Sequence, residues 1–146
     1  MMWLSVNEVK YIAFSLAQKK LSHNEPIPDF KTRYPNTLES CLASPLQTFN
    51  KKELYSTFAK KVSVLFYLMI KNHPFQNGNK RIAMTTLFLV LHINEKWIKT
   101  DMQTLYNFAV WVAGSPPMAK EQMFQYIEKF LKKYMVSIKE EKTKKE

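Results

Sequence analysis

The nine residues HPFQNGNKR, residues 73–81, form a polar connection between two long apolar stretches of this 146-residue chain. The proline disfavours helical geometry at His73, so the apolar helix before the connection should end there. One of the chain's two glycines, Gly78, completes an Asn-Gly turn, and Asn79 is a good N-cap for a second helix. The segment therefore predicts two buried helices joined by a tight loop.

Two cations of this loop, Lys80 and Arg81, fall in the first turn of the second helix. A helix N-terminus already has about half a positive charge and unpaired N–H groups, so cations there typically cost up to ~1 kcal/mol. A bound anion, best a phosphate, would offset that cost, and Gly78 lets it approach the backbone. A neutral His73 beside the phosphate could take a proton from an attacking hydroxyl. The residues alone leave open a capped connector with a surface histidine.

Helical periodicity extends outward from both ends of the loop. After the loop, residues 82–93, IAMTTLFLVLHI, are apolar nearly all round, as in a helix inside a fold. Before the loop, a long helix is predicted from about residue 54. It follows the i, i+3, i+4, i+7 rule at Leu54, Tyr55, Phe58, Ala59, Val62, Leu65, Phe66, Met69 and Ile70.

Four further helices are indicated along the chain. The first begins with a capping box formed by Ser5 and Glu8, and a loop with three prolines separates it from the second. Residues 46–50, LQTFN, break the helical pattern and could be extended. The four helices cover about residues 5–20, 37–43, 101–113 and 123–134.

These elements define one all-α domain of about six helices over residues 1–136, with the polar loop between its two central helices. Residues 137–146 are charged, and we expect a disordered tail there. The single cysteine, the absence of signal-peptide features and apolar runs far below the ~20 residues that span a bilayer favour a cytoplasmic protein. The net charge of +10 is dispersed, which argues against a nucleic-acid partner.

The segment HPFQNGNKR resembles the core motif of the Fic/Doc family, which is roughly H-P-F-x-[DEN]-G-N-[GK]-R. Residues 37–72 and 87–98 are similar to the death-on-curing (Doc) branch of that family, and the resemblance covers about residues 5–135. It implies an all-α fold in which the motif loop joins two central helices. It also implies an enzyme that uses ATP and Mg²⁺ to transfer a phosphoryl or nucleotidyl group to a protein hydroxyl.

The resemblance implies roles for residues that handle the target protein. His73 would be the base that activates the target hydroxyl, and Phe75 would anchor the loop in the core. Residues 44–50 would correspond to a flap that docks the target segment by strand-like pairing. The flap residues are Pro45, Leu46, Gln47, Thr48 and Phe49.

The remaining motif residues would bind the nucleotide. Gly78 and its neighbours' N–H groups would form the anion hole, and Asn79 would orient phosphate oxygens. Lys80 and Arg81 would hold the ATP phosphates. Asn77 stands where the family usually has an acid that binds magnesium, and a neutral amide is a weaker ligand for this hard dication.

Two positions favour one branch of the family. Lys80 replaces the second glycine of the adenylylating branch, and lysine there is the Doc pattern, associated with delivery of the terminal phosphate. Met84 stands where the adenylylating branch usually has a second arginine. We therefore predict a Doc-like toxin that phosphorylates a Ser or Thr hydroxyl of a target protein, by family analogy in the translation machinery. AMP transfer is the alternative within enzymes.

Regulation is expected to come from a separate antitoxin. Some family members contain an inhibitory pattern, [ST]-x-x-x-E-[GN], and the nearest match here runs from Ser137 to Glu141 but has Lys142 at its end. We take this match as chance. A further alternative is a binding module, because Asn77 could have weakened catalysis.

Overall fold

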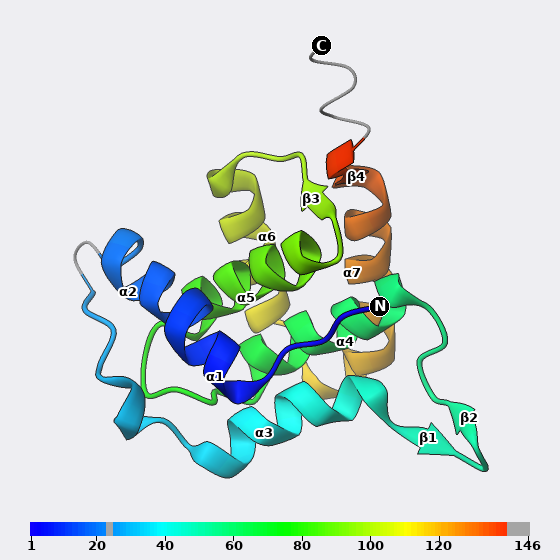
Figure 1. Ribbon diagram of the computed structural model, residues 1–146, viewed down its shortest axis with the longest axis horizontal. Coiled ribbons are helices and arrows are strands. Elements are labelled where there is room, and N and C mark those ends of the chain that lie inside the picture. The colour runs from blue at the N-terminus through cyan, green and yellow to red at the C-terminus, as the bar shows by residue number, and fades with distance from the viewer. Residues whose placement is uncertain (23–24, 140–146) are drawn as a thin grey trace.

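The computed structural model describes residues 1–22 and 25–139, which form a bundle of helices (Figure 1). The all-α prediction is confirmed, since the strands of the described residues form only two short pairs. When the N-terminal helix is taken as one element, residues 1–22 and 25–139 contain the predicted six helices. The α-helices are α1 (Val6–Glu8), α2 (Ser15–Lys20), α3 (Pro35–Ala43), α4 (Phe58–Lys71), α5 (Asn79–Ile93), α6 (Met102–Ala113) and α7 (Lys120–Tyr134).

The N-terminal helix consists of α1, a π-helical segment (Val9–Phe14) and α2, which follow one another directly. Its predicted capping box is present. Ser5 Oγ accepts from the Glu8 N–H at 3.2 Å, and Glu8 Oε1 accepts from the Ser5 N–H at 3.0 Å. Val9 and Ala13 are fully buried where this helix packs against α5.

The two central helices, α4 and α5, form the middle of the core. Every residue from 61 to 70 of α4 is buried, and so is nearly every residue from 82 to 91 of α5. The two helices pack against each other, while α7 covers α4 and α6 covers α5. Contacts on several sides explain why both sequences are apolar on more than one face.

The helix α4 begins at Phe58, so the prediction of a start near residue 54 is wrong. Thr57 caps the helix, because its Oγ1 accepts from the Lys60 N–H at 3.1 Å. The residues before the cap are held by Lys61, a buried cation that donates to the Tyr55 carbonyl and pairs with Glu53 at 3.2 Å. The Thr57 cap and the contacts of Lys61 therefore set the start of α4, although the apolar periodicity continues back to residue 54.

The predicted extended segment is a small hairpin of β1 (Thr48–Phe49) and β2 (Lys52–Glu53), which are antiparallel. The two residues of its turn, Asn50 and Lys51, have φ of 51° and 66°. Two successive left-handed residues form the type I′ turn that matches the twist of a hairpin. The hairpin projects from the body of the molecule (Figure 1).

A second strand pair joins the ends of α5 and α7. The strands β3 (Lys96–Ile98) and β4 (Met135–Ser137) are antiparallel, with Trp97 opposite Val136. Ser137, the first residue of the expected tail, thus belongs to β4. Residues 140–146, with the last part of the expected tail and of the candidate inhibitory pattern, lie outside the described residues.

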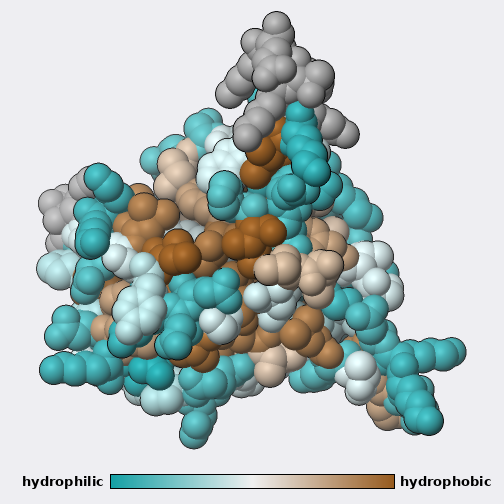
Figure 2. Space-filling view, in the orientation of Figure 1, coloured by the Kyte–Doolittle hydropathy of each residue, from teal (hydrophilic) through white to brown (hydrophobic). Residues whose placement is uncertain are grey.

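The surface mixes polar and apolar areas. Figure 2 shows apolar residues gathered across the middle of one face, over α5 and the N-terminal helix, with hydrophilic residues around them. Among the described helices, none combines the length and apolarity required to cross a membrane.

Candidate active site

The loop between α4 and α5 is folded around the side chain of Asn79. Its Oδ1 accepts from the Phe75 N–H at 2.9 Å, and its Nδ2 donates to the Phe75 carbonyl at 2.8 Å. The Phe75 ring is 3% exposed and packs against Phe14 and Phe30, with centroids 5.4 and 6.0 Å away. Asn79 and Phe75 together hold the loop backbone against the core.

Gly78 occupies the N-cap position of α5, so the prediction that Asn79 caps this helix is wrong. The amide of Asn79 is bonded to the Phe75 backbone instead of the helix start. None of the described side chains caps α5, whereas Thr57 caps α4 and Asp101 caps α6. The first-turn N–H groups of α5 are therefore available to a ligand.

The backbone conformation of the loop requires glycine at position 78. Its φ is 80°, in the left-handed region, and a Cβ added there would lie 2.7 Å from Ile27 Cγ1. His73 is also left-handed, with φ of 49°. His73 follows the C-cap of α4, where helices commonly end with a left-handed residue.

The segment between α2 and α3 lies against the loop. The Tyr34 N–H donates to the Pro74 carbonyl at 2.8 Å, and Asn77 Nδ2 donates to the Pro26 carbonyl at 3.4 Å. Ile27 packs on Gly78 from the same side. These contacts make residues 25–34 the cover of the loop.

A polar pocket of about 170 Å³ opens at the loop. His73 has an exposed ring, and its Nδ1 lies 3.5 Å from Asn79 Nδ2, the outer limit of a hydrogen bond. Lys80 has no hydrogen-bond or ion-pair partner among the described residues, so its ammonium is available. The pocket is lined by Glu25, Ile70, His73, Gln76, Asn77, Gly78, Asn79, Lys80, Arg81, Tyr106 and Ala113.

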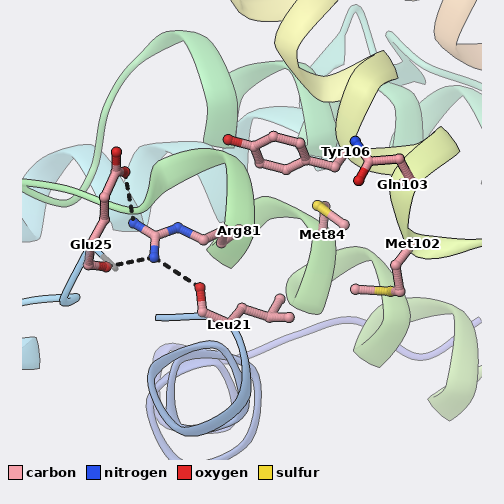
Figure 3. Close-up of a pocket in the computed structure, with 7 residues that line it drawn as sticks. All are labelled: Leu21, Glu25, Arg81, Met84, Met102, Gln103 and Tyr106. Carbon is pink, nitrogen blue, oxygen red and sulfur yellow. Dashed lines mark hydrogen bonds and ion pairs between the residues drawn. The ribbon is translucent and has the colours of Figure 1, made fainter. Parts of the chain in front are cut away.

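Arg81 is held by the chain before α3 (Figure 3). Its guanidinium donates to the Leu21 and Glu25 carbonyls at 2.9 and 2.6 Å, and it lies 3.7 Å from the Glu25 carboxylate. The Arg81 side chain is 13% exposed, whereas that of Glu25 is 75% exposed. The arginine is fixed in place, while its acidic partner is largely in water.

A second pocket, of about 360 Å³, lies on the other side of Arg81. Met84 and Met102 contribute apolar surface to it, and Tyr106 and Gln103 come from α6 (Figure 3). The two pockets share Glu25, Arg81 and Tyr106. A ligand with a charged end and a flat apolar end could therefore occupy both.

The structure does not bring the expected flap residues to this site. Residues 45–49 precede α4, whereas His73 follows it, so the two segments lie at opposite ends of that helix (Figure 1). In the hairpin, Phe49 is 72% exposed. The expected motif residues do come together, because His73, Asn77, Gly78, Asn79, Lys80 and Arg81 line one pocket.

The residues at the loop do not form a complete metal site. Glu25 is the one carboxylate among the described residues that line the polar pocket, and it pairs with Arg81. Asn77 offers only a neutral amide, and no cluster of three His, Cys, Asp or Glu occurs among the described residues. Magnesium usually takes one or two carboxylates in addition to substrate phosphates. We therefore derive no step through a metal ion.

Sequence reasoning missed Glu25 and Tyr106, which lie far from the loop in the chain. No local pattern marks either residue. The ammonium of Lys71, at the end of α4, donates to the Ala113 and Ser115 carbonyls at 3.1 and 2.6 Å. It ties the end of α4 to the end of α6 and so helps to place α6 beside the loop.

Comparison with known proteins yields one family. Residues 3–91 match the family model described as Fic/DOC family. The matched region contains the loop, the segment that covers it, all of α4 and all but the last two residues of α5. No curated protein and no solved structure matches the chain.

Proposed function

Because the chain belongs to the Fic/DOC family, whose domains are generally transferases, we propose that it is a Doc-like toxin that transfers the γ-phosphoryl group of ATP to a Ser or Thr hydroxyl of a protein. The proposal rests on one observation: His73, the uncapped start of α5, Lys80 and Arg81 all line the same pocket. A base, backbone N–H groups and cations are what phosphoryl transfer requires from a protein.

In the proposed reaction, the unprotonated ring nitrogen of His73 takes the proton of the target hydroxyl. The hydroxyl oxygen forms a bond to the γ-phosphorus, and the bond from that phosphorus to the β–γ bridging oxygen breaks. ADP leaves with the electron pair. Lys80, Arg81 and the first-turn N–H groups of α5 would stabilise the negative charge on the transferred oxygens.

Two features favour phosphate transfer over AMP transfer. Lys80 stands at the position that is glycine in the adenylylating branch, and it adds a cation beside the anion hole. Met84, at the position of that branch's second arginine, is 2% exposed and lines the larger, partly apolar pocket. AMP transfer would place the α-phosphate at the loop and leave the terminal phosphates without that second arginine.

The larger pocket provides a place for the nucleoside. We propose that the base lies between Met84, Met102 and Tyr106, and that the phosphates extend past Arg81 to the loop. The Glu25 carboxylate would then be displaced from Arg81 by a phosphate. This exchange costs little, because the Glu25 carboxylate is 75% exposed and lies 3.7 Å from the guanidinium, and Arg81 keeps its bonds to the Leu21 and Glu25 carbonyls.

The target segment would approach along residues 25–34, because these residues cover the loop. The Pro26 carbonyl and Ile27 already touch it. Residues 45–49 could contact only a more distant part of the target. By family analogy the target belongs to the translation machinery, and a separate antitoxin would inhibit the toxin.

A catalytically weakened binding module is the second candidate. Asn77 in place of an acid and the single carboxylate at the pocket favour it, because both reduce metal affinity. Such a protein would still bind ATP or a phosphate at the loop but would transfer nothing.

Two ATP labels separate these candidates. The full chain is incubated with lysate protein, Mg²⁺ and ATP labelled at the γ-phosphate or at the α-phosphate. Transfer of the γ label alone supports the proposal, and transfer of the α label refutes it in favour of AMP transfer. ATP binding without transfer of either label supports the binding module.

Matched variants test the residue roles in the same assay. His73→Ala should remove transfer, whereas His92→Ala, an exposed histidine at the end of α5, should leave it unchanged. Lys80→Ala should weaken ATP binding, and Lys19→Ala on the exposed end of α2 should not. Full activity of the His73 variant, with native helical circular dichroism, would remove the base assignment.

A further inference from the structure

The outer side of α6 combines exposed apolar side chains with uncharged polar ones such as Gln103 and Asn107. The twelve residues of this helix include no charged side chain. Leu105, Ala109 and Val112 face the core, but Val110 is 44% and Trp111 50% exposed. The surface of a monomer normally carries charges over an exposed helix face, so large apolar side chains without them indicate an interaction site.

A row of aromatic rings continues this surface onto α7. Trp111 lies 5.8 Å from Phe108 and meets Tyr126 edge-on at 5.5 Å. Phe108 stacks on Phe130 at 4.1 Å, and Phe130 contacts Tyr134 at 4.7 Å. Tyr126 is half exposed, as is Trp111. The five rings form one partly exposed strip, which we call the aromatic row, across α6 and α7.

Lysines border the aromatic row. Lys129 lies over the Tyr126 ring at 5.8 Å, and Lys133 lies over the Tyr134 ring at 5.2 Å. The acids of α7 lie elsewhere, since Glu121 and Glu128 line a different pocket with Tyr55. The row is therefore apolar at its centre and positive at its α7 edge.

We propose that the aromatic row binds an amphipathic helix of a partner protein, with an apolar stripe that covers Trp111 and acidic residues that meet Lys129 and Lys133. A helix in an apolar groove is recognised through residues spaced i, i+3, i+4 and i+7, and complementary charge fixes its position. Trp and Tyr at the centre of such a surface are typical of binding hot spots. This site is separate from the catalytic pocket, which uses Tyr106 and Ala113 of α6.

Two other occupants fit less well. Single-stranded nucleic acid stacks its bases on exposed ring faces, but Phe108 and Phe130 cover each other's faces with planes only 10° apart. In a symmetric dimer through this row, the lysine edge of one copy would have to find acids on the other. None of the residues of α6 could supply them, because that helix is uncharged.

The test selects binders from a display library of amphipathic helices whose flanking positions are Glu, Lys or Gln. Selection against the full chain should enrich sequences with Glu at the flanks. A labelled peptide of the leading sequence, followed by fluorescence anisotropy, should bind Trp111→Ala at least tenfold more weakly than the unaltered chain. The double variant Lys129→Glu, Lys133→Glu should bind that peptide about tenfold more weakly, and it should bind more tightly a peptide in which the flanking Glu residues are replaced by Lys.

Controls distinguish the site from general attraction to a basic protein. The pair Lys19→Glu and Lys20→Glu makes the same charge change on the exposed end of α2 and should leave binding unchanged. The proposal would be overturned if the control variant lost as much peptide affinity as the Lys129 and Lys133 variant. It would also fail if the selected peptides lacked acidic flanks, or if the selection enriched no peptide. It would also be overturned if the chain were a dimer that Trp111→Ala separates, or if oligothymidylate bound the row more tightly than the peptide.

Discussion

Replacement of Gly78 by alanine tests the geometry on which the candidate active site depends. Gly78 has φ of 80°, and a Cβ there would lie 2.7 Å from Ile27 Cγ1 and 3.0 Å from its Cδ1. The left-handed conformation costs an alanine roughly 1–2 kcal/mol. Displacement of the buried Ile27 side chain should add about 1 kcal/mol, the low end for an overpacked core. Alanine restricts the unfolded chain, which offsets about 0.5 kcal/mol.

We therefore expect Gly78→Ala to lower the free energy of unfolding by about 2 kcal/mol. Urea unfolding, followed by circular dichroism, should show this as a midpoint roughly 1 M lower, because m for a domain of this size is ~1–3 kcal/mol per M. The backbone part of this cost should be smaller for Gly78→Asn, since asparagine tolerates the left-handed region, but its Cβ meets Ile27 in the same way. In an Ile27→Ala background the clash is absent, so Gly78→Ala should cost about 1 kcal/mol less than in the natural chain.

A stability loss below about 0.5 kcal/mol for Gly78→Ala would contradict the reasoning, since that is the range of an ordinary surface substitution. It would mean that position 78 is not left-handed. The first-turn N–H groups of α5 and the cover formed by Ile27 would then not be arranged as described. An equal cost in both backgrounds would retain the backbone conformation but remove the contact with Ile27.

Three further predictions concern groups outside the loop between α4 and α5. Asp101 Oδ1 accepts from the Thr104 N–H at 2.7 Å, and these backbone and side-chain hydrogen bonds lower the pKa of Asp101 below its ordinary value of 3.8. The ionised Asp101 should therefore stabilise the fold fully at a pH above 3.8, and this stabilisation should be lost as the pH falls through the lowered pKa of the folded chain. The natural chain should have a higher Tm than Asp101→Asn at neutral pH, and the difference should vanish in acid. Burial raises the pKa of Cys41 to about 12, so a thiol reagent should label no cysteine in the folded chain and one after unfolding in urea; rapid labelling of the folded chain would contradict its burial. Glu53→Gln should cost about 1–2 kcal/mol in urea unfolding because it removes the charged partner of the buried Lys61, whereas Glu39→Gln, in the looser pair with Arg33 at 3.9 Å, should cost almost nothing.

The parts of the fold that sequence predicts are those set by local patterns. The ends of α4 and α5 at the loop follow from Pro74 and the Asn-Gly turn, and their burial follows from apolar residues on several faces. The start of α4 does not, because Leu54 and Tyr55 continue the helical pattern. Only the structure shows that Thr57 caps the helix and that Lys61 holds the Tyr55 carbonyl.

The role of Asn79 shows a different limit. Its place at the start of a helix indicates a cap, since asparagine is among the preferred capping residues. In the structure both atoms of its amide bind Phe75, and the helix start is left open. Local propensity does not show whether the Asn79 amide will bind the N–H groups at the helix start or the backbone of Phe75. The partners of Arg81 are likewise set by the fold, because Leu21 and Glu25 are distant in sequence.

The position of the hairpin could have been argued from length alone. Thr48 and Phe49 come before α4, and His73 follows it. A helix of fourteen residues rises about 21 Å, so segments at its two ends cannot share a small pocket. When two helices pack antiparallel, the start of one lies beside the end of the other. The start of α3 lies beside the end of α4 in this way, because the Tyr34 N–H donates to the Pro74 carbonyl. The segment that meets the loop therefore precedes α3, and a target that the proposed function places beside His73 would lie nearer to residues 25–34 than to the hairpin.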